Sequence, residues 1–421
     1  MCHVNENLRK FTFVDLFCGI GGFHSALADL GGTCVFASDI DAEARTVYES
    51  NYAIKPVGDI REVRLEDIPN HDVLCAGFPC QPFSKGGPRL GFKDKVRGTL
   101  FFEIIRIVEA KRPRFVILEN VKNLATHDGG GTWSVIVDSL QGLGYRVNPH
   151  PIVLSPHLLS PVSGGAPQHR ERVIILAEYI GKTQSDTNAS ELSWNLSMRK
   201  YPSPQWDPNS WDMIRWMRDH PPSETNLSQY MLTSDESYWL KTWGAFAMKI
   251  GKKVSGSPPV WEKELKSRAQ RKGIPLWKQN INSKNRDIYL TNKNAIDTWR
   301  KTYKPERFPD SKRKFEWQAQ DSRRRASADI MKLLIQFRPS GVRVKKPTYC
   351  GAIVAMVQTP IAGWLGRHLT PSEVGTLQGF STEFKRHSSD KIAYKQFGNA
   401  VNVNVIKFAA MEMFEQSGFW Q

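Results

Sequence analysis

The sequence predicts an α/β protein with a doubly wound, mostly parallel sheet and a second, smaller domain. The first observation is that short apolar runs alternate with helical periodicity over residues 1–180. This alternation is typical of a parallel sheet with helices on both faces. The second observation is that the alternation stops near residue 181, where basic and aromatic residues become frequent. Ordered patterning returns after about residue 346, so the chain divides into parts of different character.

Each element follows from a local signal. The expected strands are apolar runs of six to eight residues at 11–17, 33–38, 72–77, 114–119 and 172–179. The expected helices lie at 22–30, 41–52, 100–111, 132–142 and 403–414. Asp41 is a good N-cap for the second helix, and Gly142 with Gly144 forms a stop signal for the fourth. Because ligands bind beyond the carboxyl ends of such strands, the loops there form the candidate site.

Charge is distributed unevenly along the 421 residues. Residues 1–180 hold 19 Lys and Arg against 20 Asp and Glu, residues 181–346 hold 33 against 17, and residues 347–421 hold 6 against 5. The net charge of +16 therefore comes from the middle segment. A basic segment beside a neutral one indicates a polyanionic partner, with nucleic acid favoured over a membrane. The alternative is a solvated basic surface without a partner.

Other features exclude several classes of protein. No stretch reaches the roughly 20 apolar residues that span a bilayer, and the N-terminus has no signal-peptide pattern. The six cysteines show no C-x-x-C pair and no grouping with histidines. We therefore expect no metal site, no disulfide framework and a cytoplasmic location.

The loop after the first expected strand is rich in glycine, with the sequence DLFCGIGGF. Gly19, Gly21 and Gly22 would let a ligand approach the backbone where a Cβ atom would collide. The loop is not a full G-x-G-x-x-G fingerprint, and it lacks the lysine of a P-loop. Asp39 ends the next strand at the spacing where a carboxylate holds ribose hydroxyls, and Asp59 could accept from an adenine amino group. Together these features predict a nucleoside cofactor.

A cysteine follows the third expected strand in the sequence GFPCQPFS. Pro79 and Pro82 stiffen this loop, so the Cys80 thiol is presented rather than packed. An exposed, activated thiol can serve as a nucleophile. Most cysteines in soluble chains are instead inert small hydrophobes, and the residues alone leave both interpretations open.

The chain resembles the DNA cytosine carbon-5 methyltransferases, which use S-adenosyl-L-methionine. The motifs that carry this resemblance occur in the family's order: DLFCGIGGF (15–23), GDI (58–60), GFPCQPFS (77–84), RGTLFFEIIRI (97–107), ENV (119–121), QHRER (168–172), RHLTPSEVGTLQGF (367–380) and QFGNAV (396–401). The long gap between the sixth and seventh motifs is also typical of the family. The resemblance implies the Rossmann-like class I methyltransferase fold. It also implies a catalytic and cofactor-binding domain at 1–180, completed by 385–421, and a target-recognition domain at 181–384.

Four catalytic residues are implied by the resemblance: Cys80, Glu119, Arg170 and Arg172. Addition of the Cys80 thiolate at carbon 6 of cytosine would make carbon 5 nucleophilic, and loss of the carbon-5 proton would later expel the thiolate. Glu119 would hold the ring nitrogen N3 and the exocyclic amine. Arg172, and less directly Arg170, would bind the base oxygen or the neighbouring carboxylate. Without the motif order, a surface carboxylate and an ion-pair network would be the simpler interpretation.

The resemblance also implies how S-adenosyl-L-methionine is held. Phe17 would stack on the adenine, and Ile40 with Ile60 would sandwich it, although such residues are usually ordinary core. Leu100 and the turn at 399–401 would close the pocket. The complete expected cofactor set is Phe17, Gly19, Gly21, Gly22, Asp39, Ile40, Asp59, Ile60, Leu100, Asn399 and Val401.

The implied partner is double-stranded DNA, from which the target cytosine must be flipped. The segment 84–94 has the glycines and charges of a lid that closes over DNA, or it is a flexible surface loop. Arg and Lys contacts to phosphate would supply affinity in the basic segment. The expected DNA contacts are Gln81, Ser84, Lys85, Arg89, Arg323, Arg324 and Arg325, of which the three consecutive arginines are phosphate contacts or a solvated face.

We therefore expect a monomeric, sequence-specific modification enzyme associated with the nucleoid, with or without a cognate restriction endonuclease. One alternative is a transfer-RNA cytosine-5 methyltransferase on the same fold. That relative typically carries a Cys-Phe-Thr signature, which this sequence lacks. Another alternative is a non-catalytic DNA-binding regulator, although intact Cys80, Glu119, Arg170 and Arg172 argue against it.

Overall fold

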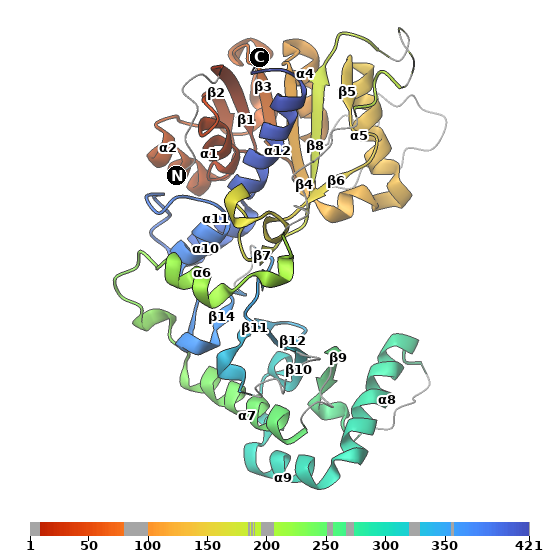
Figure 1. Ribbon diagram of the computed structural model, residues 1–421, viewed down its shortest axis with the longest axis vertical. Coiled ribbons are helices and arrows are strands. Elements are labelled where there is room, and N and C mark those ends of the chain that lie inside the picture. The colour runs from red at the N-terminus through yellow and green to blue at the C-terminus, as the bar shows by residue number, and fades with distance from the viewer. Residues whose placement is uncertain are drawn as a thin grey trace. The chain divides into compact units, whose positions relative to one another are not determined.

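The chain forms two compact units in the computed structural model, one comprising Met1–Trp211 with Gly375–Gln421 and the other Asp212–Val374 (Figure 1). The structure describes residues 9–79, 100–183, 186, 188, 190–194, 206–250, 256–266, 273–319, 329–354 and 358–420. The first unit is therefore assembled from two stretches of sequence that lie on either side of the second unit.

The first boundary between the units falls at 211/212, whereas the sequence placed a domain boundary at 180/181. Main-chain hydrogen bonds explain the difference, because the Val147 amide donates to the Leu192 carbonyl and the Trp194 amide donates to the Val147 carbonyl, each at 3.0 Å. Further along, the Trp211 indole donates to the His157 carbonyl at 2.8 Å. These contacts hold the segment after residue 180 on the first unit. The second boundary falls at 374/375 rather than 384/385.

Seven described strands form the sheet of the first unit in the order β2-β1-β3-β4-β8-β5, with β6 also paired to β8 (Figure 1). The strands are β1 (Phe11–Leu16), β2 (Gly32–Ser38), β3 (Val73–Gly77), β4 (Phe115–Val121), β5 (Tyr145–Val147), β6 (Ile152–Leu154) and β8 (Arg172–Tyr179). β1 pairs in parallel with β2 and β3, and β3 pairs in parallel with β4. β8 runs antiparallel to β4, β5 and β6. The parallel part therefore brings four carboxyl ends to one edge.

Helices cover both faces of this sheet because strand side chains alternate between them. On one face, Val116 packs in a core with Ile104 and Ile136 from two helices. On the other face, the Phe115 ring lies 5.0 Å from that of Phe414 in the last helix. The helices of this unit are α1 (Gly22–Ala28), α2 (Ala42–Tyr52), α4 (Leu100–Lys111), α5 (Gly131–Gly142), α11 (Asp390–Asn399) and α12 (Val403–Gln416). The layers give the α/β architecture that the sequence predicted.

The second unit has its own sheet, in which six of the described strands follow the order β15-β14-β11-β12-β10-β9. These strands are β9 (Gly256–Trp261), β10 (Lys314–Gln318), β11 (Leu334–Arg338), β12 (Gly341–Lys345), β14 (Ile361–Ala362) and β15 (Arg367–His368). Its helices are α6 (Met213–Asp219), α7 (Ser234–Ile250), α8 (Leu276–Thr291) and α9 (Lys293–Tyr303). Its core contains buried Trp243 and Trp299, with the Trp243 ring stacked at 4.8 Å on that of Phe315. These tryptophans are core residues.

The remaining described elements are two short strands, β7 (Gln168–His169) and β13 (Cys350–Gly351), and the helix α10 (Pro371–Leu377). Among the helices in the described part of the chain, none is long and apolar enough to cross a membrane.

Candidate functional site

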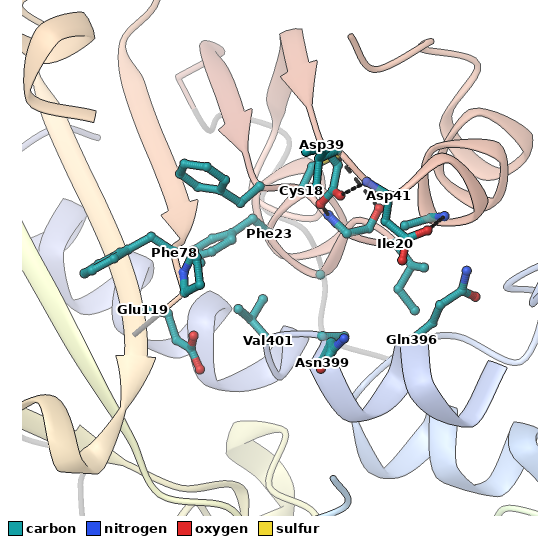
Figure 2. Close-up of a pocket in the computed structure, with 18 of the residues that line it drawn as sticks. Cys18, Ile20, Phe23, Asp39, Asp41, Phe78, Glu119, Gln396, Asn399 and Val401 are labelled. Atoms are coloured by element: carbon teal, nitrogen blue, oxygen red, sulfur yellow. Dashed lines mark hydrogen bonds between the residues drawn. The ribbon is translucent and has the colours of Figure 1, made fainter. Parts of the chain in front are cut away.

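A cavity of about 710 Å³ opens at the carboxyl ends of the parallel strands in the first unit (Figure 2). Its walls come from the segments that follow β1, β2, β3 and β4, together with residues of α11 and the turn after it. Figure 2 shows Asp39 and Asn399 on opposite sides of this space. The cavity lies where the sheet topology predicts a ligand site.

The loop after β1 has an unusual backbone. Phe17 has a φ of 54° and Gly19 a φ of 53°, both in the left-handed region. A Cβ atom added to Gly19 would meet nothing within 4 Å, so this glycine borders open space in the cavity wall. A ligand can therefore approach the backbone closely at this position.

The other two positions of the loop require glycine for a different physical reason. A Cβ atom on Gly21 would lie 2.2 Å from the Tyr52 ring, and one on Gly22 would lie 2.7 Å from Val401. Gly22 lines the cavity, whereas Gly21 is not among the lining residues. The sequence assigned all three glycines to ligand approach, but two of them are required by the packing of the protein itself.

Asp39 is held in place by the backbone around it. Its Oδ2 atom accepts from the Gly19 amide at 2.7 Å, and its Oδ1 atom accepts from the Asp41 amide at 2.8 Å. Burial raises the pKa of Asp39, while these two amides oppose that rise. The carboxylate therefore links the loop after β1 to the start of α2, where Asp41 is the N-cap. Each oxygen keeps a lone pair for a further donor.

Two isoleucines occupy contrasting positions at this end of the cavity. Ile40 is 71% exposed, which is unusual for a large aliphatic side chain, whereas Ile60 is 3% exposed. Asp59 lines the cavity but pairs with Arg61, whose Nε atom lies 2.9 Å from its Oδ1 atom. The side-chain hydrogen bond from Arg61 lowers the pKa of Asp59. The carboxylate expected to accept from an adenine amino group thus accepts from an arginine.

Leu100, Asn399 and Val401 also line the cavity. The turn that holds the last two is fixed by Arg170, whose Nη2 atom donates to the Gly398 carbonyl at 3.1 Å and to that of Ala400 at 2.8 Å. Burial, and secondarily the charge of a neighbouring arginine, lowers the pKa of Arg170 to about 9. Arg170 is thus anchored to backbone carbonyls on the opposite wall of the cavity.

Glu119 and Arg172 form an ion pair inside the cavity. The Nε atom of Arg172 lies 2.9 Å from Oε1 of Glu119, and both side chains are largely buried. Burial raises the pKa of Glu119, and the charges of Arg172 and Arg170 oppose that rise. A Cβ atom on Gly77 would lie 3.8 Å from Oε2 of Glu119 and 3.2 Å from Val401, so the glycine leaves room between these two walls. The carboxyl is therefore poised to share or donate a proton.

Eight of the expected site residues lie outside the described part of the chain: Cys80, Gln81, Ser84, Lys85, Arg89, Arg323, Arg324 and Arg325. The segment that leads to the first of them is described as far as Pro79, which lines the cavity.

Some lining residues were not assigned a role from the sequence. Phe23 and Asn120 are buried in the cavity wall, and Gln396 begins the last motif with 7% exposure. Asn120 carried one available signal, because it is a polar residue directly after an apolar strand and beside Glu119. The other two resemble ordinary helix residues in the sequence.

The chain is similar to several known proteins in sequence and in fold. The profile of the family described as C-5 cytosine-specific DNA methylase matches residues 11–415. The type II methyltransferase M.AluI of Cellulosimicrobium cellulans is 34% identical, over 96% of this chain and 92% of its own. The type II methyltransferase M.HhaI of Haemophilus parahaemolyticus is 28% identical, over 99% of this chain and 98% of its own. The crystal structure of the S. pombe Dnmt2 methyltransferase has a similar fold, with a TM-score of 0.53 and 16% sequence identity. The match covers 97% of this chain and 100% of the Dnmt2 chain.

Proposed function

Since the chain belongs to the C-5 cytosine-specific DNA methylase family, we propose a role for each residue of its cavity. The protein is a DNA (cytosine-5-)-methyltransferase of the type found in restriction-modification systems. The transfer-RNA enzyme and the non-catalytic regulator are not favoured. The observation that carries the assignment of roles is that Glu119 and Arg172 form an ion pair in the same cavity as Asp39.

The methyl donor that the family implies is S-adenosyl-L-methionine, and the cavity residues fit it. The open space at Gly19 admits a ligand against the backbone, and the 71% exposed Ile40 offers an apolar surface to a flat ring. Phe17 and Ile60 would complete the adenine site, and Asp39 would accept from the ribose hydroxyls. When bound, the cofactor supplies an electrophilic methyl group. Leu100, Asn399 and Val401 would close the cavity around it.

The reaction needs a nucleophile for the ring, because carbon 5 of cytosine is too poor a nucleophile by itself. The Cys80 thiolate adds to carbon 6, and the electron pair of the 5,6 double bond becomes available at carbon 5. Glu119 donates a proton to N3 as the thiolate adds, which its raised pKa favours. After carbon 5 has gained the methyl group, a base removes its proton. The 5,6 double bond then re-forms, the thiolate leaves and N3 returns its proton to Glu119.

The arginines have separate roles in this scheme. Arg172 orients Glu119 and donates to the base oxygen, so that it stabilises charge that develops on the ring. Arg170 acts through the turn that it anchors, because its described bonds go to the Gly398 and Ala400 carbonyls. It is therefore a positioning residue for the cofactor end of the cavity.

The substrate is DNA, and its target cytosine must leave the helix to enter the cavity. The basic segment of residues 181–346 would supply phosphate contacts through Arg323, Arg324 and Arg325, and the segment after Cys80 would contact DNA through Gln81, Ser84, Lys85 and Arg89. A cognate restriction endonuclease would be a partner in function. We expect the enzyme to act as a monomer on nucleoid DNA in the cytoplasm.

One experiment tests this proposal directly. The protein is expressed in a host that lacks DNA methylation, and 5-methylcytosine is mapped across the genome by bisulfite sequencing. The expected result is methylation of one cytosine within a short recurring sequence. Absence of 5-methylcytosine, with soluble protein present, would overturn the proposal.

A further inference from the structure

Asn120 joins the segment that leads to Cys80 to the strand that carries Glu119. Its Nδ2 atom donates to the Phe78 carbonyl at 2.9 Å, and its Oδ1 atom accepts from the Val121 amide at 2.8 Å. The residue is 2% exposed and lines the cavity. Because both ends of the amide have partners, the orientation of the side chain is fixed.

The Asn120 side chain forms its hydrogen bond directly after the last backbone pair between β3 and β4. Gly77 pairs with Glu119, and this is the last described pair between β3 and β4. Phe78 is 5% exposed, so its carbonyl needs a donor from the protein. The next residue, Pro79, has no amide hydrogen and cannot extend a ladder. The Asn120 side chain supplies that donor and thereby continues the link between the two chain segments for one residue more.

We propose that Asn120 is a positioning residue that fixes the backbone of Phe78, two residues before Cys80, beside the strand that carries Glu119. This inference rests on the proposed function, because it takes Cys80 as the nucleophile. Phe78 precedes Cys80 by two positions, and Glu119 directly precedes Asn120. One amide therefore joins the backbone two positions before Cys80 to the strand position next to Glu119.

The geometry of thiolate addition makes such a link important. The reacting atoms must approach to about 3–3.5 Å, and a misplacement of about 1 Å can lower the rate about a hundredfold. The second bond of Asn120 goes to the Val121 amide, and Val121 is in register with Arg172 across β4 and β8. The link thus ties the Cys80 segment to both members of the Glu119–Arg172 pair.

The test uses Asn120→Asp and Asn120→Ala in the full chain. The aspartate keeps the size of the side chain and its acceptor for the Val121 amide, but its carboxylate cannot donate to the Phe78 carbonyl. The measurement is the rate of covalent capture on a duplex that carries 5-fluorocytosine at the target site, with saturating S-adenosyl-L-methionine. Both variants should slow capture at least about thirtyfold. The dissociation constant of the cofactor, measured by calorimetry, should stay within about threefold of the original, because the bonds of Asn120 go to the Cys80 segment and to its own strand.

A second measurement does not depend on activity. Hydrogen–deuterium exchange of a peptide that spans residues 74–83 should be faster in both variants, with unchanged exchange in β1 and β2. If the alanine variant does not fold, the aspartate variant carries the test alone.

Asn51→Ala is the matched control. Asn51 donates to the Val47 and Lys385 carbonyls at 2.8 Å and accepts from the Lys385 amide at 2.8 Å, away from the cavity lining. Its loss should lower the melting temperature without slowing capture.

Four outcomes decide the proposal. If both Asn120 variants capture DNA within about threefold of the original rate, the inference is wrong. It is also wrong if Asn51→Ala slows capture as much, since any lost hydrogen bond would then suffice. If the original protein captures no 5-fluorocytosine, the proposed function fails first. Unchanged exchange in residues 74–83 would then overturn the ordering role of Asn120 as well.

Discussion

Arg172 places its Nε atom 2.9 Å from Oε1 of Glu119, in a cavity wall where both side chains are largely buried. The two residues come from adjacent antiparallel strands, β8 and β4. Burial raises the pKa of Glu119, and the arginine is the largest opposing influence. Arg172 therefore favours the ionised form of Glu119, and burial favours its protonated form.

Arg172→Leu should destabilise the protein in a pH-dependent way. At pH 8 the change leaves a buried carboxylate without its partner, which costs about 3–5 kcal/mol. Without Arg172 the folded-state pKa of Glu119 rises further above its unfolded value. Stability from a carboxyl with a raised pKa is present at low pH and is lost as the pH rises through that pKa. The deficit in melting temperature should therefore be larger at pH 8 than at pH 5.

Lys122→Met provides the comparison for that measurement. Lys122 lies 2.8 Å from Glu171 in a more exposed pair, so its loss should change stability by less than about 1 kcal/mol at either pH. An equal deficit for Arg172→Leu at pH 5 and pH 8 would contradict the assignment.

Cys80→Ser should abolish methyl transfer and leave DNA binding intact. In the proposed mechanism the thiolate is needed only for the covalent step, whereas the basic segment would supply the affinity for phosphate. Incorporation of a labelled methyl group and a gel-shift titration measure the two properties separately. Near-normal incorporation by the serine variant would show that the reaction does not pass through Cys80.

Asp39→Ala should weaken cofactor binding more than it slows the reaction at saturating cofactor. A contact to the ribose is made about equally in the ground and transition states, so its loss is uniform binding energy. A charge-assisted hydrogen bond of about 1.5–3 kcal/mol corresponds to a KM raised about ten- to a hundredfold. Asp29→Ala, which removes an exposed pair with Lys407, is the control. A large fall in kcat with an unchanged KM would contradict the placement.

Asp15→Asn should stabilise the protein increasingly as the pH rises. Asp15 has no exposed surface, and burial, followed by the charge of Asp39, holds its pKa well above the usual range. The original protein loses stability between the unfolded pKa of about 4 and the raised folded value, by at most about 1.4 kcal/mol per pH unit. Asparagine does not titrate, so the variant does not lose stability in this way. The difference in melting temperature should therefore grow between pH 5 and pH 8.

The exposed change Asp138→Asn is the control for that series, and its effect should be small at each pH. A melting difference for Asp15→Asn that does not vary with pH would show that Asp15 is not held protonated.

Exchange of residues 212–374 for the matching segment of a relative with another target should move the methylated sequence. The chain divides at 211/212 and 374/375, so the exchange leaves the first unit and its cavity whole. The rate of methyl transfer on the new target should remain within about tenfold, because the reacting side chains lie in the first unit. Bisulfite sequencing identifies the target. If the original site stays methylated, recognition lies outside the exchanged segment.

The elements of the first unit were predictable because their signals are local. The expected helix 41–52 is observed as Ala42–Tyr52 with Asp41 as its N-cap, and the expected strand 172–179 is observed as Arg172–Tyr179. The direction of that strand was not predictable. An apolar run in the sequence has the same pattern whether the strand pairs with a parallel or an antiparallel neighbour. In the structure, β8 is antiparallel to β4. The prediction of a mostly parallel sheet therefore rests on β1 to β4, and the sequence did not identify β8 as the strand that departs from it.

The cavity residues divide in the same way. Sequence motifs identify some of them, whereas others depend on contacts between residues that are distant in the chain. The expected cofactor residues other than Gly21 line it, and the family's motifs identified most of them in the sequence. The ring of Tyr52 leaves no room for a side chain at position 21, and Asp59 accepts a hydrogen bond from Arg61. The spacing of motifs in the sequence reveals neither contact. The link from Asn120 to Phe78 spans 42 positions and depends on strand register. Such partners become visible only when the chain is folded.

Val401 fits against Gly22, and Arg170 binds the carbonyls of Gly398 and Ala400. These contacts join the earliest and latest parts of the first unit, with residues 212–374 between them in the chain. During synthesis, the ribosome therefore delivers one wall of the cavity long before the other. A nascent chain that has not yet reached residue 401 lacks the far wall. We therefore expect the cofactor to bind only after synthesis has passed residue 401.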